Sequence, residues 1–186
     1  MLFLLKRTWP PALAALAALA GLGLALRDLL GTGAPLGLSA ESVLAGVIAF
    51  GAVLCSDGLL HGLFCLLFGK PYRTRYRELA AVFRGQTAGA ILAGSLMAGA
   101  GEEMVFRGLG TGPVYLIGSA VAFGLLHHAR RDLWPFTLWA MWQGLLFALA
   151  LWLTQRLCVP MTAHFLHDVT GFLVFRWVNR QPAAAG

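Results

Sequence analysis

Residues 98–107 read AGAGEEMVFR, and they place two glutamates and an arginine inside an apolar run that covers about residues 86–109. Side chains four residues apart share a helical face, so Glu103 and Arg107 can pair and neutralise each other. Glu102 points about 100° away from Glu103 and has no obvious cation on its own face. An apolar helix of this length fits the hydrocarbon core of a bilayer, where an ionisable residue is costly and marks a candidate functional site.

The composition extends this picture from one helix to the whole chain. Of the 186 residues, 59% are hydrophobic and 12% are charged, against about 25% charged in an average soluble protein. The mean hydropathy is +0.74. Five further apolar runs cover about residues 9–30, 42–68, 114–128, 135–154 and 159–178. Since one span needs roughly 20 apolar residues, the sequence predicts an all-α, polytopic transmembrane helix bundle of about six spans.

The runs follow one another with short connections, so we expect residues 1–186 to form a single integral membrane domain. The first run follows Lys6 and Arg7, as in a signal peptide, but equally apolar runs come after it, so we expect it to remain as the first span. The basic, tyrosine-containing stretch at residues 70–84 predicts a short amphipathic helix at the lipid headgroups. The motif-bearing core is expected at about residues 86–178.

The distribution of Lys and Arg predicts the orientation, because cytoplasmic loops are enriched in these residues. When the connections between runs are assigned alternately to the two sides of the membrane, eleven of the 14 basic residues fall on one side and three on the other. The eleven are Lys6, Arg7, Lys70, Arg73, Arg75, Arg77, Arg84, Arg130, Arg131, Arg176 and Arg180. The three are Arg27, Arg107 and Arg156. We therefore expect cytoplasmic termini in a multi-pass protein of a bacterial inner membrane. The net charge of +6 lies in short clusters rather than on one face, which argues against nucleic acid as a partner.

All five histidines and five other ionisable residues lie within predicted spans. Placing such a residue in a membrane span costs about 2.5–3.5 kcal/mol of insertion free energy, so their presence there indicates a function. The residues come from four of the runs, and they are Asp57, His61, Glu102, Glu103, Arg107, His127, His128, His164, His167 and Asp168.

This set contains the groups that peptide hydrolysis requires. Ala90, Gly94 and Ala98 precede Glu102 at four-residue steps, so that face is expected to approach a neighbouring helix and to enclose the carboxyl in a desolvated cleft. His164 and Asp168 are four apart, as are Asp57 and His61, so a carboxylate can orient each imidazole. An acid and histidines from separate helices can activate a water molecule and stabilise an oxyanion.

Other interpretations of the same residues remain open at this stage. They can form buried ion pairs that fix helix register, or a proton or ion relay. A zinc site of Glu102, His127 and His164 is chemically possible, although the sequence has no H-E-x-x-H pair. The cysteines predict neither a disulfide framework nor a zinc knuckle, because no C-x-x-C spacing occurs among Cys55, Cys65 and Cys158.

Three motifs occur in order on separate predicted spans: EEMVFR at residues 102–107, FGLLH at residues 123–127 and HFLHD at residues 164–168. This arrangement resembles the CAAX protease and bacteriocin-processing family, also called type II CAAX prenyl endopeptidases or Abi proteins. The family signatures are E-E-x-x-x-R, F-x-x-x-H and H-x-x-x-N or D. The resemblance covers roughly residues 98–171, and it implies an intramembrane endopeptidase of the glutamic type that uses no cofactor.

The resemblance also implies a role for each motif residue. Glu102 with His127 would activate the water, His164 with Asp168 would support the oxyanion, and Glu103 with Arg107 would hold the glutamate-bearing helix. The best-known eukaryotic members have Asn at the position of Asp168, and an ionised Asp cannot donate a hydrogen bond. We therefore expect Asp168 to orient His164 instead.

The expected partner is a membrane-associated peptide or protein, such as a lipidated CAAX-like tail, a precursor peptide or a C-terminal sorting helix. The alternative is a proteolytically inactive immunity or scaffold protein that binds a membrane peptide. A tight turn at residues 110–113 would place Glu102 and His127 about 9 Å apart in depth, at 1.5 Å per residue. The predicted orientation places Glu102 and His164 in the outer half of the bilayer, whereas the prenyl enzymes of the family are expected to open toward the cytosol. The sequence does not indicate an oligomeric state.

Overall fold

The fold is known from a computed structural model, which describes residues 33–128 and 131–180 together with residues 18, 21–23, 25, 26, 29 and 31. The regular elements within this part of the chain are α2 (Ala40–Val82), α3 (Ala88–Phe106), α4 (Pro113–Leu126), the 3-10 helix η2 (Arg131–Leu133), α5 (Trp134–Thr154) and α6 (Cys158–Arg180). All of them are helical, which confirms the all-α prediction. The predicted first span at residues 9–30 lies largely outside the described residues, as does the tail after residue 180.

Local sequence signals explain where these helices begin and end. The Thr87 side chain accepts a hydrogen bond of 3.1 Å from the Ala90 backbone N–H and so caps the start of α3. Proline occupies the first turn of both α4 and α5, where its missing N–H costs no helical hydrogen bond. Gln155 ends α5 with a left-handed φ of 54°. The described helices thus coincide closely with the apolar runs from residue 42 onward.

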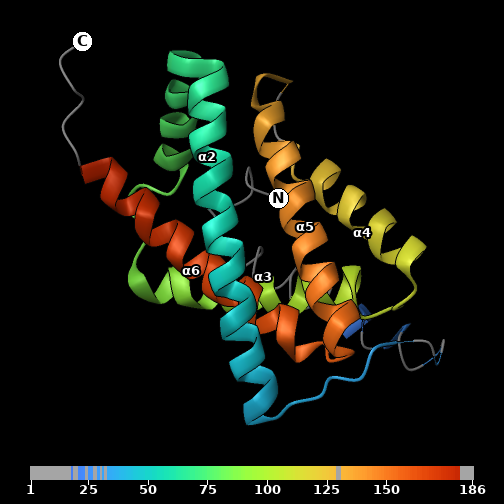
Figure 1. The fold of residues 1–186 in the computed structure, drawn as a ribbon. Helices are drawn as coiled ribbons and strands as arrows, with labels where there is room; N and C mark the ends of the chain where they lie inside the picture. The colour runs from blue at the N-terminus through green and yellow to red at the C-terminus, as the bar shows by residue number, and fades with distance from the viewer. Residues whose placement is uncertain are drawn as a thin grey trace.

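Helix α2 breaks at Gly69 and turns back on itself. The backbone of Gly69 has φ 53° and ψ −132°, a conformation that glycine adopts without a Cβ clash, and Pro71 follows it. In Figure 1 the limb after the break lies beside the end of the limb before it. The second limb covers the predicted amphipathic segment, and it buries Tyr72 against Phe136 and Ala80 against Phe175. Its helical state is confirmed, while its location at the headgroups stays a prediction.

The surfaces of the long helices are suited to lipid. By length and composition, α2 and α5 are the two helices in the described ranges that could cross a membrane, and α4 is apolar but shorter. Large apolar side chains are exposed along them, such as Leu59 at 76%, Leu66 at 82% and Leu153 at 68%. Contiguous apolar surface of this kind is typical of contact with a partner or a membrane. The full set of six spans stays a prediction.

Glycines set the closest helix contacts. Helix α6 packs against α2 and α3, and α5 packs against α4. A Cβ on Gly99 of α3 would lie 2.9 Å from the backbone nitrogen of Phe165 in α6. A Cβ on Gly144 of α5 would lie 3.0 Å from Cα of Ala120 in α4. Small residues therefore allow these backbones to touch. In Figure 1, α3 lies across the bundle behind α6, whereas α4 and α5 run as neighbours.

Candidate active site

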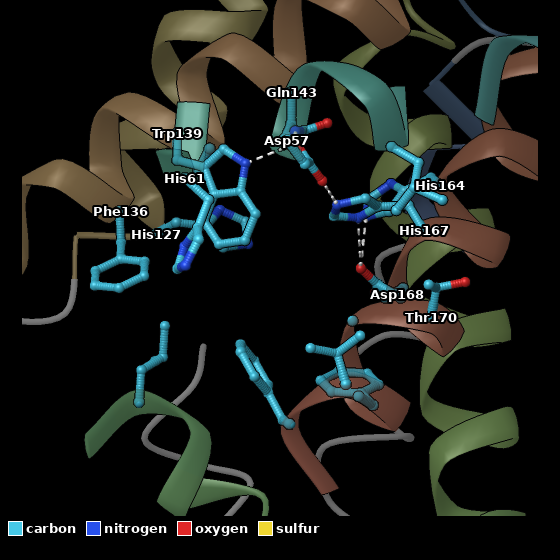
Figure 2. A pocket seen from close by; sticks show the side chains of 18 of the residues that line it. Asp57, His61, His127, Phe136, Trp139, Gln143, His164, His167, Asp168 and Thr170 are labelled. Carbon is cyan, nitrogen blue, oxygen red and sulfur yellow. Dashed lines mark hydrogen bonds and ion pairs between the residues drawn. The ribbon is translucent and has the colours of Figure 1, made fainter. Parts of the chain in front are cut away.

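A cavity of about 420 Å³ lies between α2, α3, α4, α5 and α6. Most of the lining side chains are apolar, including the rings of Tyr76, Phe83, Phe123, Phe136, Trp139, Phe147, Phe172 and Phe175. The polar lining side chains are Asp57, His61, Glu102, His127, Gln143, His164, His167, Asp168 and Thr170. Figure 2 shows that His127 from α4 and His164 from α6 reach this space from different sides. One cavity therefore unites residues from the three sequence motifs.

Glu102 lies where these motif residues meet. It is 4% exposed, and its Oε2 is 3.9 Å from Nε2 of His127 and 3.9 Å from Nε2 of His164. Its Oε1 forms no hydrogen bond with any residue that the structure describes. A separation of 3.9 Å is too long for a direct hydrogen bond and matches a bridge through one water molecule. Glu102 is thus a buried carboxyl whose oxygens are available to another molecule.

The face of α3 that carries Glu102 borders the cavity, and Glu102 is buried there as expected. Gly94 and Ala98, at four-residue steps before Glu102, line the same cavity. The close contact with α6 is made one residue further around the helix, by the face that carries Gly99 and Glu103. The small residues before Glu102 therefore make room inside the cavity.

Glu103 and Arg107 form the expected ion pair and are both 0% exposed. Nη1 of Arg107 donates to Oε1 of Glu103 over 2.8 Å, and Nη2 donates to the carbonyl oxygen of Gly144 in α5 over 3.0 Å. The guanidinium also lies 4.8 Å from the centre of the Phe123 ring, within the range of a cation–π contact. Arg107 therefore connects α3 to both α4 and α5.

His127 ends α4 with its ring held by the helix itself. Its Nδ1 donates to the carbonyl oxygen of Phe123 over 2.7 Å, and its ring packs on the Phe123 ring at a centroid distance of 4.3 Å. A neutral imidazole that donates from Nδ1 carries its lone pair on Nε2. That nitrogen faces Glu102, so His127 can accept a proton beside the carboxyl.

His164 is oriented by Glu103 and not by Asp168. The sequence spacing predicted Asp168 as its orienting carboxylate, but Nδ1 of His164 lies 2.8 Å from Oε1 of Glu103. Asp168 Oδ1 is 3.8 Å from the other ring nitrogen, Nε2, which faces Glu102 as well. The i,i+4 spacing brought Asp168 near, but α3 approaches closely enough at Gly99 for Glu103 to take the hydrogen bond.

The predicted difference in depth between Glu102 and His127 does not keep their side chains apart, since these approach to 3.9 Å. The prediction placed α3 and α4 as antiparallel neighbours around the turn at residues 110–113, whereas α3 lies across the bundle in Figure 1.

The suggested pair of Asp57 and His61 does not form either. Nδ1 of His61 lies 3.0 Å from the Tyr72 hydroxyl on the second limb of α2. Asp57 instead pairs with His167 of α6, with 2.7 Å between Oδ2 and Nε2. His128 bonds the Thr137 hydroxyl over 2.7 Å and does not line the cavity.

The sequence analysis missed two residues that bind Asp57 in the cavity wall, because it considered only ionisable side chains there. Trp139 and Gln143 of α5 both donate to Oδ1 of Asp57, the indole over 2.8 Å. Gln143 is 4% exposed within an otherwise apolar helix. A lone amide in an apolar run was the available signal, because a buried polar group needs a partner.

The described residues contain no group of three or more His, Cys, Asp or Glu side chains arranged to hold a metal ion. Among the residues that were considered as a zinc site, Glu102 Oε2 lies 3.9 Å from Nε2 of His127 and 3.9 Å from Nε2 of His164.

The comparisons with known proteins agree with the motifs. The family model described as type II CAAX prenyl endopeptidase Rce1-like matches residues 84–170. No curated protein and no solved structure matches the chain. The matched residues contain the paired glutamates with Arg107, the phenylalanine-to-histidine segment that ends at His127, and the segment from His164 to Asp168. Over these residues the chain is therefore similar to the CAAX protease family.

Proposed function

We propose that this protein is an intramembrane endopeptidase of the glutamic type, in which Glu102 and His127 activate a water molecule and His164 with Asp168 supports the oxyanion. The observation that carries the proposal is the position of Glu102 Oε2, 3.9 Å from Nε2 of both histidines at the wall of an apolar cavity. The match to a CAAX prenyl endopeptidase family supports the protease class.

The first chemical step is the attack of water on a peptide carbonyl. A water molecule between Glu102 Oε2 and His127 Nε2 donates one hydrogen bond to each acceptor. As its oxygen bonds to the carbonyl carbon, one of its protons passes to Glu102. Phe123 holds the His127 ring through both the Nδ1 hydrogen bond and the ring contact, so no reorganisation is needed at this moment.

The second step breaks the carbon–nitrogen bond of the tetrahedral intermediate. Protonated His164, with Nδ1–H donated to Glu103, carries its second proton on Nε2 and donates it as a hydrogen bond to the oxyanion. The nearby Asp168 carboxylate stabilises this imidazolium by charge. Glu102 then returns its proton to the leaving nitrogen, so that one water molecule and one peptide bond give a carboxylic acid and an amine.

The cavity supports a membrane-associated substrate. Its wall is largely aromatic and aliphatic. An apolar group of the substrate can therefore move from the lipid into the cavity and remain in apolar surroundings. The family name points to a prenylated C-terminal peptide as the first candidate. A precursor peptide or a C-terminal sorting helix would use the same wall.

The catalytic groups named above are all supplied by the chain, so the proposal includes no cofactor. It also includes the membrane arrangement expected from the sequence, with six spans in a bacterial inner membrane and both termini in the cytoplasm. The exposed apolar side chains of α2 and α5 support this setting.

The decisive experiment measures cleavage by purified protein in detergent micelles. The probe is an internally quenched peptide with a farnesylated cysteine near its C-terminus. We expect the wild type to cleave it, and we expect Glu102→Gln and His127→Gln to abolish turnover while the proteins remain folded by circular dichroism. His128→Gln is the matched control, since His128 adjoins His127 in sequence and does not line the cavity.

Turnover by Glu102→Gln equal to that of the wild type would refute the proposal. Binding of the peptide by the wild type without cleavage would support an inactive peptide-binding protein in its place.

A further inference from the structure

Asp57 is a buried carboxylate for which the proposed hydrolysis has no direct use. It is 9% exposed and lies on the first limb of α2, which carries no motif residue. Both donors from α5, the Trp139 indole and the Gln143 amide, bind the same oxygen, Oδ1. The other oxygen, Oδ2, is left for His167 of α6 at 2.7 Å. Asp57 therefore has its own anchorage on α5 and one remaining contact on α6.

His167 connects Asp57 to the proposed catalytic groups. Its Nε2 faces Asp57, and its Nδ1 lies 3.5 Å from Oδ1 of Asp168. The same Asp168 oxygen lies 3.8 Å from Nε2 of His164. Figure 2 shows Asp57, His167, Asp168 and His164 as one continuous series along the cavity. The series runs from an anchored carboxylate to the imidazole that faces Glu102.

We propose that Asp57 is a positioning residue for this reaction, which acts through His167 to fix the Asp168 carboxylate beside His164; the proposal rests on the function proposed above. The hydrogen bond from Nε2 of His167 to Asp57 fixes the ring, whose Nδ1 forms no hydrogen bond with the described residues and lies at ion-pair distance from Asp168. Asp168 itself has 20% of its side chain exposed, and His164 donates its hydrogen bond to Glu103 rather than to Asp168. His167 adjoins Asp168 in sequence and lies at ion-pair distance from its carboxylate, so it is the group through which Asp57 can position Asp168.

A hydrogen bond that only links two helices would contribute to stability without affecting the reacting groups. The chain offers such a link one residue away, where Nε1 of Trp142 in α5 donates to Oγ of Ser56 in α2 over 2.9 Å. This contact joins the same two helices as Asp57 does, but it does not touch His167. Ser56→Ala is therefore the matched control for Asp57→Asn.

Steady-state kinetics with the farnesylated probe provide the first test. We expect Asp57→Asn to lower kcat about tenfold or more with KM within about twofold, as is usual when the partner that orients a working side chain is lost. We expect Ser56→Ala to retain both constants. His167→Gln, which leaves Asp57 with its α5 donors, should reproduce the kcat defect and serves if Asp57→Asn fails to fold. A fall in thermal stability with kcat intact would overturn the proposal.

A double-mutant cycle then asks whether Asp57 acts through Asp168. If it does, the variant with both Asp57→Asn and Asp168→Asn is no slower than Asp168→Asn alone. Multiplied defects in the double variant would show separate routes and would overturn the proposal.

A spectroscopic measurement separates this proposal from the protease assignment. We expect Asp57→Asn to shift the ring ¹⁵N resonances of His164 as well as those of His167, whereas Ser56→Ala leaves His164 unchanged. Unchanged His164 resonances in Asp57→Asn would overturn the positioning role whatever the activity. A wild type that cleaves nothing, together with shifted His164 resonances, would refute the hydrolysis and leave the coupling of Asp57 to His164 in place.

Discussion

Oε1 of Glu103 and Nδ1 of His164 share a hydrogen bond of 2.8 Å across 61 residues of sequence. The same oxygen accepts a hydrogen bond of 2.8 Å from Arg107, so one buried carboxylate holds a cation from its own helix and an imidazole from α6. Glu103 thereby joins two of the three motif-bearing helices, α3 and α6. Its neighbour Glu102, one residue earlier, has no comparable contact with the described part of the chain.

This difference predicts that both adjacent glutamates are needed for turnover but that only Glu103 is needed for stability. Glu103→Gln leaves the Arg107 charge buried without a counter-charge, so we expect a loss of about 3–5 kcal/mol in the free energy of unfolding and a loss of turnover. Glu102→Gln should abolish turnover with little change in stability. Unfolding by denaturing detergent, followed by circular dichroism, measures the first effect. Equal stability of both variants would contradict the proposed division of roles.

The contact between α4 and α5 predicts a packing effect at Gly144. An added Cβ there lies 3.0 Å from Cα of Ala120 and 3.0 Å from Nη2 of Arg107, so Gly144→Ala should cost about 1–3 kcal/mol of stability. Gly118→Ala on α4 is the control, because its Cβ meets no described atom within 4 Å. Thermal unfolding in detergent compares the two. A stability loss of the same size at Gly118 would show that the effect is not one of packing.

The cavity predicts that its volume limits the substrate. Ala98 lies one helical turn before Glu102 and lines the cavity, so Ala98→Leu should fill space that a substrate needs and should lower kcat/KM about tenfold or more. Ala93→Leu places the same side chain on an exposed position of α3 and should leave kcat/KM unchanged. Unimpaired cleavage by Ala98→Leu would place the substrate outside this cavity.

The mechanism without a cofactor predicts resistance to chelators. We expect turnover to survive prolonged treatment with EDTA and then with 1,10-phenanthroline, because the proposed steps use carboxyl and imidazole groups alone. Elemental analysis of the treated protein checks that any bound metal has been removed. Activity that is lost on chelation and restored by zinc would favour the zinc alternative.

The proposed orientation predicts which connections face the cytoplasm. Single cysteines are introduced by Gly112→Cys, between α3 and α4, and by Arg77→Cys, on the second limb of α2, after Cys55, Cys65 and Cys158 are changed to Ala. In intact cells, a membrane-impermeant maleimide should label position 112 and not position 77. The reverse pattern would invert the orientation and move the Glu102 end of the cavity to the cytoplasmic half.

The sequence predicted most of what depends on a single helix. The apolar runs anticipated the helices from residue 42 onward, and the four-residue spacing anticipated the pair of Glu103 and Arg107. The partners of Asp57 and His164 were wrong, because spacing along one helix identifies neighbours on that helix alone. Their true partners depend on how α3, α5 and α6 cross. Close contacts at glycines allow those crossings. The sequence alone does not show which glycines face a neighbouring helix.

The pairing of Glu103 with Arg107 within one helix has a consequence for biosynthesis. In the proposed six-span arrangement, the two charges lie four residues apart, so α3 enters the bilayer with this pair already neutralised, before the ribosome has made α6. His164 is translated later and meets a carboxylate that already has a counter-ion. The order of the three residues along the chain thus means that neither Glu103 nor Arg107 is an isolated charge in the lipid while the bundle is assembled.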